Sequence, residues 1–363
     1  MEALVWSTLD QVTFPGMSRS VVSFGFVRDV TVTEEGGRVV ASVHLRVSTH
    51  NPGVGDSLKQ AVEQALGELQ EIDEARVQVD VTTPQRPEVQ QQQAIARDAA
   101  LLPDVRHIVA VASGKGGVGK STVASNLAAK LAQMGHRVGL LDADIYGPSA
   151  PLMFGIDAKP RVVDEKLLPF EKHGVQVMSL GFVLDVDTPV VWRGPMVMKA
   201  IEQLLGDVAW GELDFLIVDL PPGTGDAQLT LTQKVPLSGA VIVSTPQDVA
   251  LIDARKGLAM FRKVNVPVLG MIENMSGFSC PKCGEVTYIF KHDGARVTSE
   301  VLDCRFLGGI PLDPAIVRGG DEGRPVVVVD PEGPHGRAFG EVASAVIEEV
   351  EAQSRRRPTL EIL

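Results

Sequence analysis

The chain has 363 residues, of which 44% are hydrophobic and 22% are charged, and its net charge is −12. This length suggests two or three domains of ~100–200 residues each, and the composition is typical of a globular protein rather than a disordered one. The dispersed negative charge disfavours nucleic-acid binding, and the sequence shows neither a membrane-spanning apolar run nor a signal-peptide pattern. We therefore expect a cytoplasmic protein that binds neither nucleic acid nor membranes.

Residues 1–81 predict a small α+β domain. Two β-rich runs, Phe24–Thr33 and Arg38–Val47, flank a turn with two glycines and predict a hairpin. Ser57 fits the capping box of a helix, and Arg76–Val81 alternates between apolar and polar side chains as a half-buried strand does.

Residues 82–106 are rich in proline and glutamine and predict a linker. In residues 107–363, short apolar runs alternate with turns and helical patterns, which predicts an α/β domain with a doubly wound, mostly parallel sheet. The predicted strands are Ile108–Ala112, Val138–Leu141, Phe215–Val218, Ala240–Val243 and Val266–Ile272. Because ligands bind beyond the carboxyl ends of such strands, we expect the chemistry in the turns that follow them.

The turn after the first of these strands has the Walker A spacing. It reads Gly114-Lys115-Gly116-Gly117-Val118-Gly119-Lys120-Ser121-Thr122. Its glycines allow backbone N–H groups to surround phosphate oxygens, which predicts a P-loop that binds ATP. We expect Lys120 to reach the β- and γ-phosphates and the Ser121 hydroxyl to ligate Mg²⁺. The spacing alone does not decide between two roles for Lys115: a group that points outward to a neighbouring molecule, and a solvated surface lysine.

Two aspartates follow later strands of the same series. Asp144 lies after the second strand and Asp219 after the third. One such carboxylate can hold Mg²⁺ through water and the other can orient the attacking water, although either could instead cap a helix. Neither turn contains an arginine that could stabilise the transition state, so Lys115 is a candidate for that role.

The chain contains three cysteines, two of them in Cys280-Pro281-Lys282-Cys283. A C-x-x-C turn can hold zinc or iron, but it supplies two of the four ligands that such a centre needs. Three alternatives stay open: a [4Fe–4S] cluster shared between two copies, a zinc site completed by a residue such as His292, and a redox dithiol. We expect Cys304 to be a small buried hydrophobic residue rather than a ligand.

Together these motifs resemble the MinD/ParA-like ATPases with a deviant Walker A, and among them the Mrp/ApbC branch of iron–sulfur cluster carriers. The resemblance covers about residues 100–330 through five motifs: Gly114–Thr122, Asp144–Ser149, Pro221–Asp226, Glu273–Ser276 and Cys280–Gly284. Residues 1–81 resemble the small domain that precedes the ATPase in such proteins, with Asn51 in place of its usual cysteine.

The resemblance implies a role for each site residue. Lys115 would reach across a homodimer to the partner's nucleotide, Asp144 would be the catalytic switch residue, and Asp219 would serve the metal ion. Asn274 would contact adenine. Cys280 and Cys283 would hold the cluster.

The resulting hypothesis is an ATP-hydrolysing carrier that binds a [4Fe–4S] cluster at a homodimer interface. It would exchange the cluster with iron–sulfur assembly proteins and recipient apoproteins, with slow turnover in their absence. The alternative is a MinD/ParA-type positioning or partitioning ATPase with zinc at the C-x-x-C, but the acidic segment Glu341–Glu351 suits neither anionic lipid nor DNA. A reductase like the nitrogenase iron protein is disfavoured because that family uses two well-separated cysteines.

Overall fold

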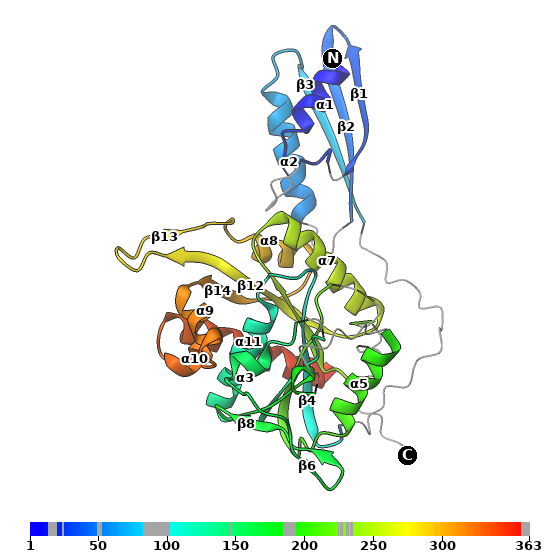
Figure 1. Ribbon diagram of the computed structural model, residues 1–363. Coiled ribbons are helices and arrows are strands. Elements are labelled where there is room, and N and C mark those ends of the chain that lie inside the picture. Colours follow the sequence, from blue (N-terminus) through cyan, green and yellow to red (C-terminus); the bar gives the residue numbers. More distant parts are fainter. Residues whose placement is uncertain are drawn as a thin grey trace. The chain divides into compact units, whose positions relative to one another are not determined.

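A computed structural model describes residues 1–13, 20–23, 25–48, 53–82, 102–145, 147–183, 194–223, 225, 228–229, 232 and 235–356 (Figure 1). The chain divides into two compact units, one of residues 1–90 with 296–304 and one of residues 91–295 with 305–363. Most of the predicted linker, Asn51, and three motif residues (Tyr146, Thr224 and Asp226) lie outside the described residues.

The first unit is a small α+β fold. Its elements are α1 (Glu2–Leu9), β1 (Val27–Glu35), β2 (Arg38–Ser48), α2 (Gly53–Gly67) and β3 (Glu74–Thr82). The sheet order is β1-β2-β3, with β1 antiparallel and β3 parallel to β2. Leu58, Val62 and Leu66 of α2 form a core with the apolar face of the sheet. The capping-box prediction is wrong: the helix already includes Gly53, so Ser57 lies inside it and its hydroxyl donates to the Gly53 carbonyl.

The second unit is built on a nine-stranded sheet in the order β13-β12-β11-β4-β10-β5-β9-β8, with β14 paired to β12. Its parallel strands are β4 (Val105–Ser113), β5 (Val138–Asp142), β9 (Val175–Ser179), β10 (Leu213–Asp219), β11 (Gly239–Ser244), β12 (Val268–Ser279) and β14 (Phe306–Leu312). Two short antiparallel strands, β8 (Phe170–Lys172) and β13 (Val286–Thr287), border it. The predicted doubly wound, mostly parallel sheet is confirmed. A separate hairpin joins β6 (Val162–Val163) to β7 (Lys166–Leu167).

Helices lie on both faces of this sheet (Figure 1). They are α3 (Lys120–Gln133), α4 (Ala150–Met153), η1 (Leu180–Phe182), α5 (Gly194–Gly206), α7 (Asp248–Lys263), α9 (Pro314–Asp321), α10 (Val326–Val329) and α11 (Pro334–Arg356). The remaining helix, α8 (Gly294–Val301), consists mostly of residues that belong to the first unit. The central strands are buried on both faces because these helices cover them, which is why their sequences are continuous apolar runs. No helix in the described part of the chain is long and apolar enough to cross a membrane.

The sheet brings the predicted site residues to one edge. Strands β5 and β10 are parallel neighbours, and their register pairs Asp142 with Asp219 at the carboxyl ends. The P-loop follows β4, which lies on the other side of β10. The topology therefore collects the phosphate loop and the strand-end carboxylates where open α/β sheets bind their ligands.

Candidate nucleotide and cysteine sites

The P-loop has close contacts at two of its glycines. A Cβ on Gly114 would lie 2.1 Å from the carbonyl carbon of Asp253 in α7. Gly119 directly precedes α3 at φ +80°, and a Cβ there would lie 2.1 Å from the side-chain nitrogen of Asn274. Gly114 therefore requires glycine because the backbone of α7 lies against it, and Gly119 because of its positive φ together with the Asn274 side chain.

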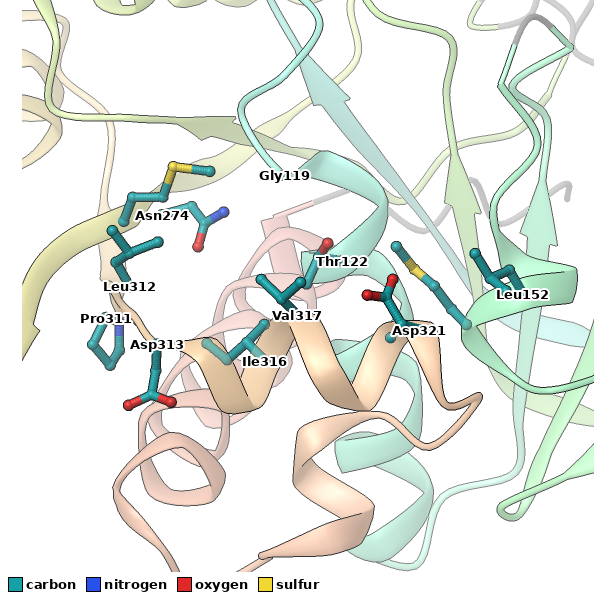
Figure 2. A pocket seen from close by; sticks show the side chains of 13 residues that line it. Gly119, Thr122, Leu152, Asn274, Pro311, Leu312, Asp313, Ile316, Val317 and Asp321 are labelled. Atoms are coloured by element: carbon teal, nitrogen blue, oxygen red, sulfur yellow. The ribbon is translucent and has the colours of Figure 1, made fainter. Parts of the chain in front are cut away.

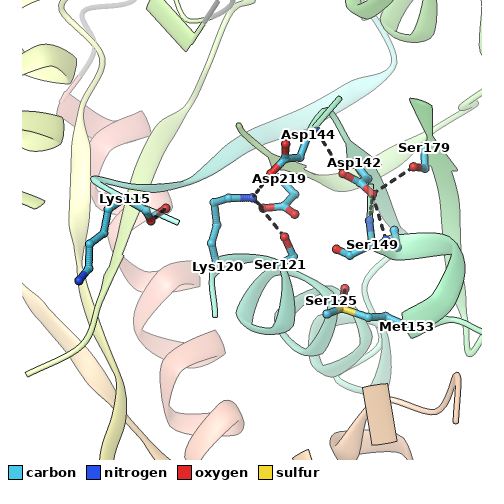
Figure 3. Close-up of polar contacts among 12 residues, drawn as sticks. Lys115, Lys120, Ser121, Ser125, Asp142, Asp144, Ser149, Met153, Ser179 and Asp219 are labelled. Carbon is cyan, nitrogen blue, oxygen red and sulfur yellow. Dashed lines mark hydrogen bonds and ion pairs between the residues drawn. The ribbon is translucent and has the colours of Figure 1, made fainter. Parts of the chain in front are cut away.

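Lys120 lies in a cluster of buried polar groups at the start of α3. Its Nζ is 2.5 Å from Asp219 Oδ1, 3.2 Å from Ser121 Oγ and 3.6 Å from Asp144 Oδ2 (Figure 3). The other oxygen of Asp144, Oδ1, is buried and has no hydrogen-bond partner among the described residues. Oxygen ligands of this kind suit Mg²⁺, and an unpartnered buried carboxylate oxygen is free to accept from a water or a metal-bound water.

The neighbouring carboxylates are crowded into a region of low dielectric. Burial raises the pKa of Asp142 to about 6, and the nearby charge of Asp219 adds to this rise. Burial also raises the pKa of Asp219, against the opposing effect of the Lys120 ammonium. A divalent cation would relieve this concentration of negative charge, so the residues present fit a magnesium ion.

Lys115 stands apart from this cluster. Its side chain is half-buried, and Figure 3 shows it pointing away from Lys120 and the aspartates. Its own backbone carbonyl accepts a hydrogen bond from the Ser113 hydroxyl. Within one chain, the two lysines of the loop therefore face different directions.

A pocket of about 180 Å³ adjoins the loop (Figure 2). Its lining includes Gly119, Thr122, Asn274, Pro311, Asp313 and Ile316. The Asn274 amide donates to the carbonyl of Val118 at 2.9 Å, and Figure 2 shows its oxygen directed toward the pocket. A mostly apolar slot with one amide, continuous with the phosphate loop, can take the flat base of a nucleotide.

Cys280 and Cys283 lie on the tight turn between β12 and β13. The turn is closed by hydrogen bonds from Cys280 N to the Glu285 carbonyl at 2.9 Å and from Gly284 N to the Cys280 carbonyl at 2.8 Å. The backbone N–H groups of Cys283 and Lys282 donate to the Cys280 sulfur and lower its pKa, which favours the thiolate that metals bind. Cys283 is exposed and Cys280 half-buried, so both thiols are accessible.

Within the part of the chain that the structure describes, the cysteine pair has no further metal ligand. Among the described residues, no group of three or more His, Cys, Asp and Glu side chains could hold a metal ion. His292 instead pairs with Asp293 at 3.3 Å and lies against the ring of Tyr288. Cys304 is half-buried rather than buried as expected, and it belongs to the other compact unit.

The sequence did not point to the residues that line the pocket opposite Asn274. They lie at the end of β14 and in α9, and β14 contains two glycines and a proline, so its sequence is not a continuous apolar run. A signal was present, because Asp313 caps α9 and Pro314 occupies its first turn, as in many helix starts. The sequence alone predicts no role for Asp142.

Two family models match the chain. The model for the NUBPL iron-transfer P-loop NTPases covers residues 104–347, and a model for iron–sulfur cluster assembly proteins covers residues 2–79. The chain belongs to the NUBPL iron-transfer P-loop NTPase family. The resemblance to iron–sulfur carrier ATPases drawn from the five motifs is thereby confirmed.

Relatives of this NUBPL-family chain carry names that describe iron–sulfur cluster transport. An iron–sulfur cluster carrier protein of Aquifex aeolicus is 43% identical over 369 residues, covering 97% of this chain and 98% of its own. The iron–sulfur cluster transfer protein NUBPL of Mus musculus is 53% identical over 249 residues, 68% of this chain and 78% of its own. These relatives favour the carrier hypothesis over the positioning-ATPase alternative.

Solved structures agree with the fold. A nucleotide-binding protein from Archaeoglobus fulgidus, in complex with ADP, has a TM-score of 0.58 and 41% identity over 68% of this chain and 95% of its own. The cell-division ATPase MinD of Pyrococcus furiosus, at 24% identity and a TM-score of 0.53 over 67% of this chain and 98% of its own, shares the fold.

Proposed function

We propose that this NUBPL-family protein binds and hydrolyses ATP, and carries a [4Fe–4S] cluster between two copies of the chain to recipient apoproteins. One observation carries the proposal: a single chain combines a phosphate loop and its buried carboxylates with a separate turn that offers two thiols, beside which the described residues supply no third ligand. The names of its relatives give the cargo its chemical class. We place this activity in the cytoplasm, whose reducing conditions suit free thiols.

In the proposed nucleotide site, most of the roles belong to residues of a single chain. The loop from Gly114 to Thr122 would hold the phosphates, and Asn274 would bind the base in the adjoining pocket. Ser121 and Asp219 would hold Mg²⁺, which neutralises charge on the transferred phosphoryl group when bound. Asp144, whose Oδ1 is buried and unpartnered, would orient the attacking water.

Lys115 would act on the nucleotide of a second copy. Its side chain points away from Lys120, so its ammonium is not directed at the phosphates held by its own loop (Figure 3). In a two-fold dimer with the loops face to face, the same direction would bring it to the partner's nucleotide.

The cluster half of the site also calls for a second copy. A [4Fe–4S] cluster takes four thiolates, and Cys280 and Cys283 supply two, so two copies about a two-fold axis complete the set. Beside the thiols, the β12–β13 hairpin and the residues after it expose large apolar side chains: Val286, Tyr288, Ile289 and Phe290. Contact between two copies would remove these groups from water and bring the four sulfurs together.

Replacing Lys120 tests the nucleotide assignment. We expect Lys120→Ala to weaken Mg-ATP binding by about 10- to 100-fold, because a charged hydrogen bond to phosphate contributes about 1.5–3 kcal/mol. Isothermal titration measures the dissociation constant. The matched control is Lys115→Ala, which removes the same charge from the same loop and should keep the dissociation constant within about threefold of the wild type. Equal losses in the two variants would show that the two lysines are not distinguished as proposed.

Polar substitution of the exposed hairpin tests the contact between copies. The double variant Ile289→Ser with Phe290→Ser should weaken the cluster-loaded dimer by at least about tenfold, because each buried apolar side chain contributes roughly 1.5–3 kcal/mol. Sedimentation of the iron-loaded protein under anaerobic conditions measures this. Val162→Ser, which changes a more exposed apolar residue on β6, is the control and should leave the dimer intact. An unchanged dimer in the double variant would exclude this face from the interface.

A further inference from the structure

Asp142 is the most heavily hydrogen-bonded carboxylate of the nucleotide site, although it faces neither Lys120 nor the pocket. It lies at the end of β5 and is fully buried. Its Oδ1 accepts from the backbone N–H of Asp144 at 3.1 Å. Its Oδ2 accepts from the N–H groups of Ser149 at 2.9 Å and Ala150 at 3.0 Å, and from the Ser179 hydroxyl at 3.0 Å (Figure 3).

Only one of these four bonds, the one to Oδ1, comes from Asp144, and the other three go to Oδ2. The Oδ2 bonds fix the far end of the loop between β5 and α4, together with the end of β9. The single Oδ1 bond fixes the backbone of Asp144 itself. Asp144 in turn reaches Lys120 at 3.6 Å and keeps its own Oδ1 buried and unpartnered. The direction of that free oxygen depends on where the Asp144 backbone is held.

We propose that Asp142 is a positioning residue for ATP hydrolysis, which holds Asp144 through its backbone N–H so that the Asp144 carboxylate stays directed at the attacking water. This inference rests on the proposed function, in which Asp144 orients that water. The requirement is geometric, since a group that orients a nucleophile has to be held within about 0.5 Å of its productive place.

The donor set explains why an ionised carboxylate is needed. An aspartate accepts through both oxygens, whereas asparagine has one acceptor oxygen and an NH₂ group that donates. In Asp142→Asn, the amide oxygen can take the Oδ2 position and keep three donors satisfied. The NH₂ group then faces the Asp144 N–H, and that one bond is lost. The substitution therefore acts selectively on Asp144.

Ser179→Ala provides a matched comparison on the same carboxylate. It removes the hydrogen bond from the Ser179 hydroxyl to Oδ2 and the one that Gly181 N–H donates to that hydroxyl, and it leaves the bond between Oδ1 and Asp144 in place. Both variants should lower Tm, because each loses at least one buried hydrogen bond. A merely structural role of Asp142 predicts equal effects on turnover, whereas a positioning role predicts different ones.

The experiment measures phosphate release and Mg-ATP binding by the full-length protein. We expect Asp142→Asn to lower kcat by about 100-fold, the order expected for a displaced reacting geometry, with the dissociation constant of ATP within about threefold of the wild type. Ser179→Ala should keep kcat within about threefold of the wild type. Wild-type kcat in Asp142→Asn, or an equal loss in Ser179→Ala, would overturn the inference.

A double-mutant cycle tests the coupling directly. In the background of Asp144→Ala, Asp142→Asn should lower kcat no further, because the group that it positions is absent. An additive loss would contradict the inference. If Asp142→Asn does not fold, Asp142→Glu carries the same test, since the longer side chain keeps the charge but displaces the oxygen from the Asp144 N–H. Full turnover in Asp144→Ala would defeat the proposed role of Asp144, whereas an inactive Asp144→Ala with a fully active Asp142→Asn would defeat this inference alone.

Discussion

A mixed dimer of Lys115→Ala and Asp144→Ala chains is expected to hydrolyse ATP, although each variant alone is inactive. The Lys115→Ala chain keeps its own Asp144, and its nucleotide would receive Lys115 from the Asp144→Ala partner. One of the two sites is then complete. We expect this because, within one chain, the Lys115 side chain points away from Lys120 (Figure 3).

The size of the effect makes the test decisive. Stabilisation of the transition state by a cation supplied from a partner contributes about 10³–10⁵ in rate, so each homodimer should be close to background. Random mixing makes half of the dimers heterodimers with one live site, so roughly a quarter of wild-type turnover should return.

The control is the pair Lys120→Ala with Asp144→Ala. In the proposed site Lys120 acts on its own nucleotide, so the Lys120→Ala chain would bind ATP poorly, and its partner lacks Asp144. This mixture should stay inactive. If Lys115 acted within its own chain, neither chain of the first mixture would have both groups. No recovery in that mixture, with heterodimers verified by mass, would contradict the trans assignment.

Removal of either thiol of the C-x-x-C turn is expected to abolish cluster binding. Cys280→Ala or Cys283→Ala would leave two thiolates in a dimer where a [4Fe–4S] cluster takes four, and the described part of the chain offers no metal-binding group to replace them. Iron and sulfide analysis after anaerobic reconstitution, with the visible absorption of the cluster, measures the outcome.

Cys304→Ala is the matched control for this loss. Cys304 is half-buried and lies outside the turn, so its removal should leave the iron content unchanged. Wild-type iron content in Cys280→Ala would rule out the turn as the cluster site. Loss of iron in Cys304→Ala as well would show that the third cysteine takes part.

The central sheet could be predicted from the sequence because buried parallel strands are continuous apolar runs. Strands β4, β5, β10, β11 and β12 all cover or overlap such runs. The edge strands β8 and β13 could not be found in this way, since they have only three and two residues and lie at opposite ends of the sheet. Their formation depends on the neighbouring strand rather than on their own pattern.

In the candidate site too, some features could be predicted from the sequence and others could not. The P-loop is contiguous in sequence, and its requirement for glycine is visible in the spacing. The contact of Asn274 with Val118 joins residues 156 positions apart, and no local pattern predicts it. The hydrogen bonds of Asp142 depend on where a loop places its backbone N–H groups, which composition does not encode. The sequence therefore predicted the chemical groups, and the fold was needed to show which of them meet.

Native mass spectrometry of the full-length protein after anaerobic reconstitution with iron and sulfide tests the central claim most directly. We expect a species with the mass of two chains and one [4Fe–4S] cluster, which returns to metal-free protein when the cluster is passed to an acceptor apoprotein. A monomer that holds a complete cluster, or a single zinc ion bound to each chain in place of iron, would contradict it.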